Sequence, residues 1–294
     1  MIVRIKEKSF YSMLMMGACL LILLLVGFFV TLFWQAWLGM SLLKGTFFVQ
    51  TIWDVSRDHY GIVTFVIGTL LTSFLALMIA VPFGLAISLL LTQYFTTGWV
   101  ASFVRQSIDL LAGIPSVIFG FWGLLVLVPF IRSIQMYCGS VPYGVGIFTA
   151  SLILALMVVP FIATIAIEVM TLVPNDLKEA AYALGATKSE VIRHVVLPCC
   201  ASGIFSGVLL AFGRAIGETM AVTMVIGNAN FFPKHLFDPG NTMASVIANE
   251  FAEATGELHV SALIYLALSL FVLSALINMC GKWGVRRWSL RKGH

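Results

Sequence analysis

The chain has 294 residues, of which 60% are hydrophobic and only 10% are charged. Soluble domains carry roughly 25% charged residues, so a water-soluble fold of this length is excluded. The formal net charge of +4 is explained by the distribution of Lys and Arg among the loops, and we expect no nucleic-acid binding. The composition therefore predicts an all-α polytopic membrane protein.

Six apolar stretches are long enough to cross a bilayer, which takes about 20 residues of α-helix. Of the 17 Lys and Arg residues, most lie in the two tails and in the second and fourth loops. Because short cytoplasmic loops are enriched in Lys and Arg, we predict that both termini are cytoplasmic. The predicted spans are 10–37, 64–91, 108–131, 144–172, 203–228 and 259–281.

The first span differs from a cleaved signal peptide. Its apolar core runs from Met13 to Phe33, which is longer than the usual stretch of roughly 7–15 residues. No small-residue cleavage site follows it. We therefore predict a retained helix that anchors the protein in the membrane.

The third span contains the sequence Gly-Ile-Pro-Ser at Gly113–Ser116. Glycine and proline are tolerated within spans where neighbouring helices satisfy the freed backbone groups. The sequence predicts a helix break at Pro115 and Ser116, beside a packed or hydrated interior that forms part of a pathway. Close helix packing through small residues is an equally weighted alternative.

The fourth loop, 173–200, is the longest on the cytoplasmic side and is predicted to form two short helices. Asn175 and Asp176 are in position to cap the first helix, which we expect to end at Gly185. The second is predicted to begin at Thr187, in capping-box spacing, and to stop at Pro198. The first helix places Ala180, Ala181 and Leu184 on one face. That face is predicted to contact another protein, or alternatively to pack against the chain's own bundle.

The fifth span carries two charged residues, Arg214 and Glu218, in an otherwise apolar run. As residues i and i+4 of one helix, they are predicted to share a face. A charge at the centre of a span costs about 2.5–3.5 kcal/mol, so ionisable residues there indicate functional sites. Arginine suits an oxyanion, since its planar guanidinium donates to two oxygens at once. Phosphate, sulfate and carboxylates are candidates, and an ion pair that only fixes helix packing is the alternative.

The loop 229–258 has a turn at Asp238–Gly240 and then a predicted short helix from Asn241 to about Ala254. This helix is expected to line a mouth, to contact a soluble partner, or to form part of a solvated hairpin. The acidic residues expected to face the outer compartment are Glu250, Glu253 and Glu257.

Common catalytic and nucleotide-binding motifs are absent from the sequence. There is no G-x-x-x-x-G-K-[ST], no H-E-x-x-H and no G-x-S-x-G. The five cysteines show no metal-ligand spacing, and the five histidines are scattered. We predict a chain that is not an enzyme and that binds neither a metal ion nor a cofactor of its own.

The segment KEAAYALGATKSEVIRHVVLP resembles the cytoplasmic coupling loop of ABC-importer permeases. This resemblance implies a type I ABC-importer permease fold with six transmembrane helices. It also implies that the first helix of the loop docks into a groove on a separate ATPase subunit, in agreement with the missing P-loop. The matching loop residues are Glu179, Ala180, Ala181 and Gly185.

Further segments, among them AGIPSVIFGFWGL, GRAIGETMAVTMVIGN and ANEFAEATGELHVSAL, resemble the phosphate-specific permeases of the PstC type. The resemblance implies a core permease domain at 64–281. Before it come a cytoplasmic tail, the first helix and a first periplasmic loop, together 1–63, and after it a basic cytoplasmic tail, 282–294. By the same resemblance, Arg214 and Glu218 match a charged pair implicated in phosphate passage.

The resemblance also implies partners in the bacterial cytoplasmic (inner) membrane. They are a PstA-like second permease, an ATPase subunit dimer, a periplasmic phosphate-binding protein, membrane lipid and a phosphate-sensing regulator. The implied cycle is alternating access: ATP-driven closure of the ATPases opens the permease outward, and hydrolysis resets it inward.

Three other functions are open to such a chain. An ion-gradient-driven secondary anion transporter would show an inverted repeat with paired broken helices, and the two halves of this sequence show no convincing match. A permease for another oxyanion would use the same arginine chemistry. In a non-transporting assembly or sensor subunit, the charged pair would only hold helices together.

Overall fold

The computed structural model describes the backbone of residues 2–291 and the side chains of residues 10–284. For the predicted basic tail, 282–294, the structure therefore describes the backbone as far as residue 291 but the side chains only as far as residue 284. Six helical segments of the described chain are long and apolar enough to cross a membrane, which confirms the predicted number of spans. These segments are Phe10–Phe48, Val63–Tyr94, Ser116–Tyr137, Ile147–Thr171, Lys188–Ile216 and Glu257–Gly284.

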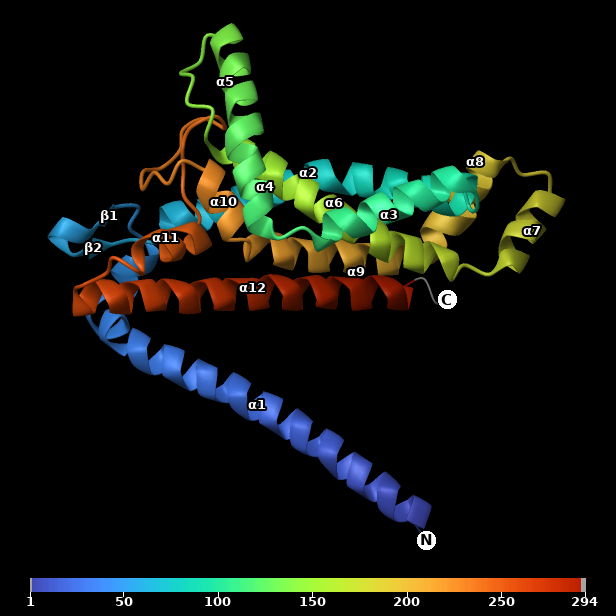
Figure 1. Ribbon diagram of the computed structural model, residues 1–294, viewed down its shortest axis with the longest axis horizontal. Coiled ribbons are helices and arrows are strands. Elements are labelled where there is room, and N and C mark those ends of the chain that lie inside the picture. Colours follow the sequence, from blue (N-terminus) through green and yellow to red (C-terminus); the bar gives the residue numbers. More distant parts are fainter. Residues whose placement is uncertain (1, 292–294) are drawn as a thin grey trace.

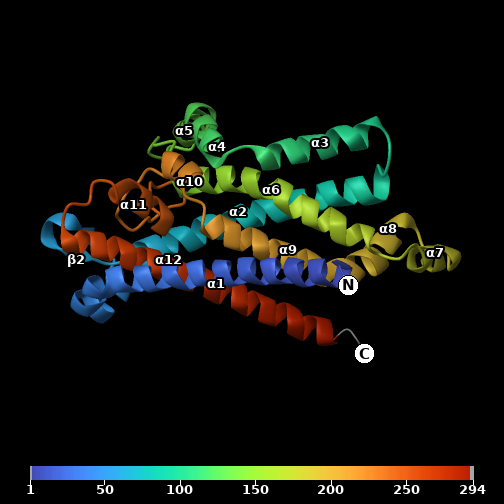
Figure 2. The same ribbon diagram turned by 60° about the horizontal axis from the view of Figure 1, so that its bottom comes forward.

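Four long helices form the body of the molecule. α2 (Val63–Leu89), α6 (Ile147–Thr171), α9 (Leu197–Ile216) and α12 (Glu257–Arg291) run side by side along its longest axis (Figures 1 and 2). α2 and α6 share the most extensive contact, where small side chains of α2 face buried residues of α6. Both chain ends point toward the same end of this bundle, as an even number of spans requires.

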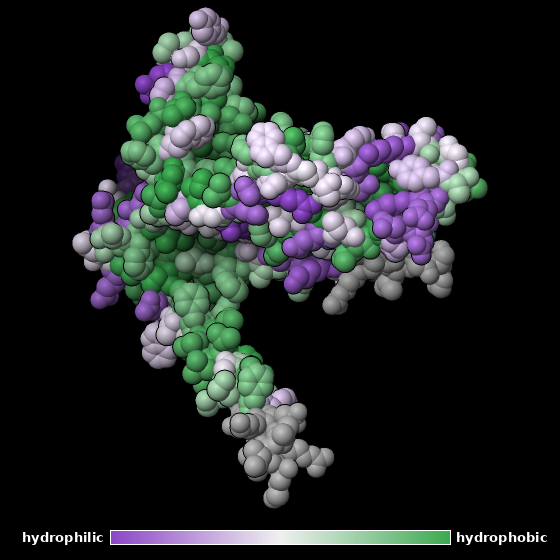
Figure 3. Space-filling view, turned by 45° about the vertical axis from the view of Figure 1, so that its right-hand side comes forward, coloured by the Kyte–Doolittle hydropathy of each residue, from purple (hydrophilic) through white to green (hydrophobic). Residues whose placement is uncertain are grey.

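α1 (Ile2–Leu43) packs on α12 only near its C-terminal end and then diverges from the bundle (Figure 1). The Ser261 hydroxyl of α12 is inserted into α1: it accepts from the Gly39 N–H and donates to the Gln35 carbonyl. The apolar side chains of α1 are otherwise exposed, and Figure 3 shows them as a hydrophobic column. Such a surface is suited to lipid or to another membrane-embedded protein.

The end of the bundle that carries two short strands is called the hairpin end below. β1 (Trp53–Asp54) and β2 (His59–Tyr60) pair antiparallel there, with Trp53 opposite Tyr60. They pack beside α11 (Met243–Glu250), which is shorter than the helix predicted between Asn241 and Ala254. Thr242 and Ser245 form a capping box at the start of α11.

Short turns of other helical types occur between or within the long helices. The short 3₁₀ turns are Lys44–Phe48 and Val55–Arg57, and the π-helical turns are Leu90–Tyr94, Gly123–Leu127 and Ile192–Val196.

The predicted break in the third span is confirmed. α3 (Trp99–Gly113) ends where Ile114 and Pro115 are extended, because a residue before proline avoids helical backbone angles. The span itself begins at Ser116 and ends at Tyr137, later than the predicted 108–131. α3 and α4 (Ser116–Trp122) both contact α6, and α4 also packs on α10 (Met220–Val225), whereas α5 (Val128–Tyr137) turns away from the bundle in Figure 1.

The fifth span begins earlier and ends earlier than the predicted 203–228. α8 (Lys188–Val191) continues through a π-helical turn into α9, so the stop predicted at Pro198 is wrong. Proline removes one backbone donor from a helix. The π-helical turn of five residues directly before α9 shifts the hydrogen-bond register there, which lets the helix pass the proline.

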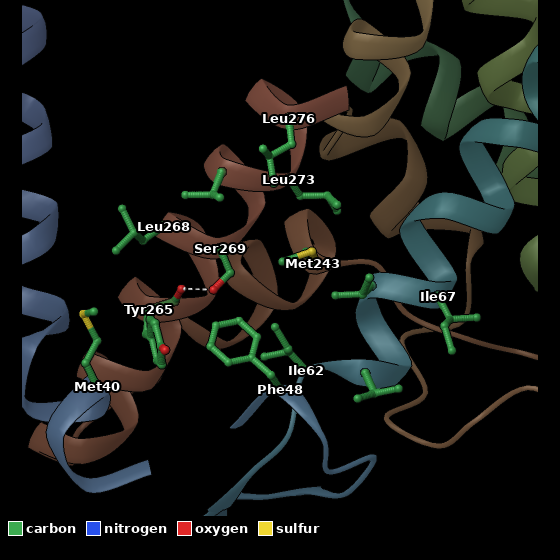
Figure 4. Close-up of a pocket in the computed structure, with 13 residues that line it drawn as sticks. Met40, Phe48, Ile62, Ile67, Met243, Tyr265, Leu268, Ser269, Leu273 and Leu276 are labelled. Atoms are coloured by element: carbon green, nitrogen blue, oxygen red, sulfur yellow. Dashed lines mark hydrogen bonds between the residues drawn. The ribbon is translucent and has the colours of Figure 1, made fainter. Parts of the chain in front are cut away.

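An apolar cavity of about 550 Å³ lies between α12 and the N-terminal part of α2, beside the C-terminal end of α1 (Figure 4). The Ser269 hydroxyl on its wall donates to the Tyr265 carbonyl at 2.8 Å, so this polar group is already satisfied. Neither Arg214 nor Glu218 lines the cavity. Its lining does not suit an anion, and we place the candidate transport site elsewhere.

Candidate transport site and coupling surface

Arg214 lies in the last turn of α9, and its side chain is exposed. Its guanidinium carbon is 6.0 Å from the centre of the Phe161 ring on α6, at the outer limit of a cation–π contact. A cation in the last turn also interacts favourably with the helix dipole. Within the described part of the chain, the guanidinium makes no hydrogen bond or ion pair. Its N–H donors are therefore available to an anion.

Glu218 does not share a helix face with Arg214, so that prediction is wrong. α9 ends at Ile216, and the chain passes through Gly217 to Thr219 before the six-residue α10 (Met220–Val225) begins. Glycine is unfavourable inside a helix by about 1 kcal/mol relative to alanine, which favours an end at this point. The Glu218 side chain is half-buried, and no ion pair joins it to Arg214 among the described residues.

The separation of these two charges restricts what surrounds them. Insertion of one unpaired charge into lipid costs about 2.5–3.5 kcal/mol, and here neither charge offsets the other. Helical breaks at membrane depth are likewise tolerated only beside protein or water. Both the unpaired charges and the helix break are therefore compatible with a polar or protein-covered environment and incompatible with direct exposure to lipid.

The break in the third span packs close to α10. A Cβ added to Gly120 of α4 would lie 2.9 Å from the Ala221 Cα, so the two backbones are in close contact. Ile114, at the break itself, packs against the same buried cluster as Ala221. Ser116 is half-buried and Pro115 is exposed. The small-residue packing alternative thus accounts for the helix after the break, and the predicted pathway role of Pro115 and Ser116 stays a prediction.

Glycines also bring α9 against its two neighbours. A Cβ on Gly207 would lie 2.6 Å from Cγ2 of Ile165 on α6. One on Gly213 would lie 2.9 Å from Nδ2 of Asn278 on α12. This close packing fixes the orientation of the helix end that carries Arg214.

α7 (Asn175–Ala183) forms the predicted first helix of the fourth loop. It begins directly after Pro174, so the side-chain cap predicted for Asn175 and Asp176 is absent. Gly185 follows the helix with φ +84°, a left-handed conformation that favours glycine, and its N–H donates to the Tyr182 carbonyl. The Thr187 N–H donates to the Glu190 carboxylate at 2.7 Å, which confirms the predicted capping box.

None of the residues of α7 is buried. Glu179 and Ala180 are exposed, and Leu184 keeps 90% of its surface accessible. Ala181 is half-buried against the cluster around Val191, so only this residue of the predicted face packs on the chain's own bundle. Figure 3 shows hydrophilic side chains around this end of the molecule. Exposed apolar side chains in such a setting are typical of a docking surface for another protein.

Glu250 at the hairpin end was expected to face the outer compartment, but its carboxylate is turned into the protein. Oε2 accepts from Trp53 Nε1 at 2.9 Å and lies 3.1 Å from His259 Nε2, and Oε1 accepts from Asn230 Nδ2 at 3.0 Å. The fully buried Val246 lies one turn before Glu250, and this i, i+4 spacing is the sequence signal for its orientation. Neither this cluster nor any other group of three His, Cys, Asp or Glu residues in the described chain is arranged to hold a metal ion.

Tyr60 lies next to this cluster and stacks on the His259 ring, with ring centres 5.8 Å apart. Its hydroxyl donates to Asp58 at 3.4 Å. Burial, followed by the negative charge of Asp58, raises the pKa of Tyr60 to about 12. The phenol therefore stays protonated at neutral pH.

Comparison with known proteins identifies relatives that match nearly the whole chain. The family model described as "Binding-protein-dependent transport system inner membrane component" matches residues 80–289. The protein named phosphate transport system permease protein PstC from Haemophilus influenzae is 38% identical, over 98% of this chain and 95% of its own length. The protein of the same name from Mesorhizobium japonicum is 40% identical, over 98% of this chain and 92% of its own length.

Two solved structures share the fold at low sequence identity. A bacterial ABC transporter involved in the import of alginate superposes with a TM-score of 0.69 at 14% identity and covers 96% of both chains. The MetNI methionine ABC transporter, in an inward-facing conformation, gives a TM-score of 0.57 at 20% identity, over 75% of this chain and 92% of its own. The fold is thus that of type I ABC-importer permeases, as the coupling-loop segment implied. The chain belongs to the family of binding-protein-dependent transport system inner membrane components, a family of multi-pass transport permeases rather than enzymes, and within it to the PstC proteins.

Proposed function

We propose that this chain is the permease subunit of an ATP-driven importer of inorganic phosphate. The observation that carries the proposal is the identity of 38–41% to several relatives named phosphate transport system permease protein PstC, over nearly the full length of both chains. The exposed guanidinium of Arg214 at a break between two helices supports an anion as the substrate.

Arg214 binds phosphate as the anion passes between this chain and a second, PstA-like permease. Its planar guanidinium donates to two phosphate oxygens and remains charged at any physiological pH. Glu218, beyond the helix end, carries the opposite charge and repels phosphate. When the break rearranges, its carboxylate competes with phosphate for the guanidinium and favours release. Pro115 and Ser116 border the same pathway at the neighbouring helix break.

The exposed α7 transmits the conformational change of the ATPase subunits to the transmembrane helices. It docks into a dimer of ATPase subunits through Glu179, Ala180 and Leu184, while Gly185 sets the turn that orients it. Both termini are then cytoplasmic, because they lie toward the same end of the bundle as α7. Phosphate arrives from a periplasmic binding protein at the hairpin end. This chain needs no cofactor of its own, and a phosphate-sensing regulator is a further partner of the assembly.

An ion-gradient-driven anion transporter is the second candidate. It would work without an ATPase, and the exposed apolar surface of α7 would then have no role. A permease for another oxyanion would retain α7 but not the preference for phosphate.

The test is uptake in cells that lack their own high-affinity phosphate import. The chain is expressed with its second permease, ATPase and binding protein, and the uptake of labelled phosphate and sulfate is measured. The matched control carries an inactivating substitution of the P-loop lysine in the ATPase. We expect phosphate uptake that requires the intact P-loop. Uptake that survives in the control would support the ion-driven alternative, and a preference for sulfate would contradict the substrate.

A further inference from the structure

We infer that Glu250 is a positioning residue, which couples the docking of the binding protein at the hairpin end to α10 and to the helix break beside Arg214. The inference rests on the proposed function and adds to it a route between the two sites. It also assigns a role to the ANEFAEATGELHVSAL segment, which neither the candidate anion site nor the coupling surface explains.

The carboxylate of Glu250 connects three segments that are distant in the sequence. Its donors are Trp53 in β1 and Asn230 in the loop after α10, and His259 in the first turn of α12 lies within hydrogen-bonding distance. The side chains of Glu250 and His259 keep only 21% and 10% of their surface accessible. Hydrogen bonds to a charged group that is shielded from water are stronger than those between neutral groups. Glu250 is therefore a strong cross-link between these segments.

From Asn230 the polar contacts continue into the protein. Asn241 Nδ2 donates to the Asn230 side-chain oxygen at 2.8 Å, and the buried Ser245 hydroxyl donates to the Asn241 side chain. The Met243 N–H at the start of α11 donates to the Thr69 hydroxyl of α2 at 3.0 Å. The cluster at Glu250 is thus attached to the main bundle as well as to the hairpin.

The same loop holds α10 at its C-terminal end. The Gly240 N–H donates to the Ile226 carbonyl at 3.0 Å, and the Ala229 N–H donates to the Gly240 carbonyl at 3.0 Å. α10 has only six residues and begins two residues after Glu218. Because α10 is this short, a shift at its C-terminal end is carried to its N-terminal end, and so to the helix break.

The other side of the cross-link is accessible to a soluble protein. Trp53 itself is buried, but it leads directly into the exposed turn that contains Val55 and Arg57. A protein that docks on the hairpin end displaces or fixes this turn. Through the indole N–H of Trp53 and the carboxylate of Glu250, this change reaches Asn230 and then α10.

Glu250→Gln tests this coupling because it keeps the size of the side chain. One carboxylate oxygen becomes an NH₂ group, which cannot accept from Trp53 or from Asn230, so one cross-link is lost. Glu253→Gln is the matched control, because Glu253 lies one turn away and its side chain is exposed. Asn230→Ala removes the next contact in the route.

The experiment measures ATP hydrolysis and phosphate uptake by the complete reconstituted complex at increasing concentrations of phosphate-loaded binding protein. For Glu250→Gln, we expect the maximal stimulated rate to fall about tenfold, within the usual range of coupling between sites, with basal hydrolysis and the half-saturating concentration unchanged. Asn230→Ala gives the same pattern, the double variant is no worse than either single variant, and Glu253→Gln matches the wild type.

Other outcomes overturn the inference. A raised half-saturating concentration at an unchanged maximal rate would make Glu250 a docking residue, and loss of basal hydrolysis in a fully assembled complex would make it a purely structural one. If the Glu250→Gln complex fails to assemble, the variant Trp53→Phe tests the inference in the same assay. It removes the indole N–H that donates to Glu250 and keeps an aromatic side chain at this position. An unchanged maximal rate in that variant overturns the inference. Absence of phosphate uptake in the wild type would instead contradict the proposed function.

Discussion

Arg214 and Glu218 are separated by the end of a helix: Arg214 lies in the last turn of α9, and Glu218 lies two residues beyond Ile216, where α9 stops. Four residues apart in one helix, they would have formed an ion pair and would have satisfied each other. Because the helix ends between them, the guanidinium does not spend its donors on Glu218. The same break gives the carboxylate a separate position, between α9 and α10.

The first prediction concerns the energetic independence of these charges. Residues without a direct contact have effects on stability that add within about 0.3–0.5 kcal/mol. We expect the thermal unfolding shifts of Arg214→Gln and Glu218→Gln to add in the double variant of the purified complex. A double variant that is clearly more stable than the sum of its single variants would reveal an ion pair, and would contradict the observed separation.

The second prediction concerns the turn after α7. Gly185 has φ +84°, which costs a residue with a side chain about 1–2 kcal/mol, although asparagine tolerates this conformation. Gly185→Val is expected to reduce both co-purification of the ATPase and its stimulation by loaded binding protein, whereas Gly185→Asn is expected to retain both. Gly185→Asp, which adds a negative charge to the turn, is expected to uncouple or detach the ATPase. Equal behaviour of all three variants and the wild type would show that the turn geometry does not orient the docking helix.

The third prediction concerns the contact between α4 and α10. Gly120→Ala would place its methyl group 2.9 Å from the Ala221 Cα, and overpacking of this kind costs about 1–3 kcal/mol. We expect a lower thermal unfolding midpoint and reduced phosphate uptake. Gly113→Ala is the control, because no atom lies within 4 Å of the added Cβ. Similar unfolding midpoints for the two variants would contradict the close packing.

The fourth prediction concerns alkaline stability at the hairpin end. The folded protein raises the pKa of Tyr60 from near 10 to about 12, so it holds the phenolic proton more tightly than the unfolded chain does. The stabilisation from this group is complete below about pH 10 and is lost as the pH rises toward 12. Thermal unfolding of the wild type should therefore fall more steeply over this interval than that of Tyr60→Phe. Parallel curves for the two proteins would contradict the shift.

Several features of the fold could be predicted because they depend on local chemistry. Span number follows from apolar length, and the break at Pro115 follows from the backbone restriction before proline. The capping box of Thr187 and the left-handed turn at Gly185 depend on a few adjacent residues. Each of these was found in the structure.

The predictions of helix ends were wrong where the backbone can either continue as a helix or break. Pro198 normally ends a helix, but the π-helical turn before α9 lets the helix continue. Conversely, the apolar run through Ile216 suggested a continuous helix, whereas Gly217 and Thr219 lie in a break. The i, i+4 spacing from the buried Val246 indicates that Glu250 points inward, but its partners lie 20 and 197 residues away in the sequence, and periodicity does not identify them. The anion site at Arg214 stays a prediction from the sequence, and the position of Glu218 beyond the end of α9 could not be predicted.

The central claim is that Arg214 contacts phosphate on an ATP-driven pathway. It is tested most directly by phosphate uptake into proteoliposomes that contain the complete transporter, with wild-type and Arg214→Gln complexes of equal subunit composition. We predict that the variant retains its ATPase and its basal hydrolysis but loses phosphate uptake, because glutamine has neither the charge nor the paired donors of arginine. Phosphate uptake by Arg214→Gln at the wild-type rate would contradict this account.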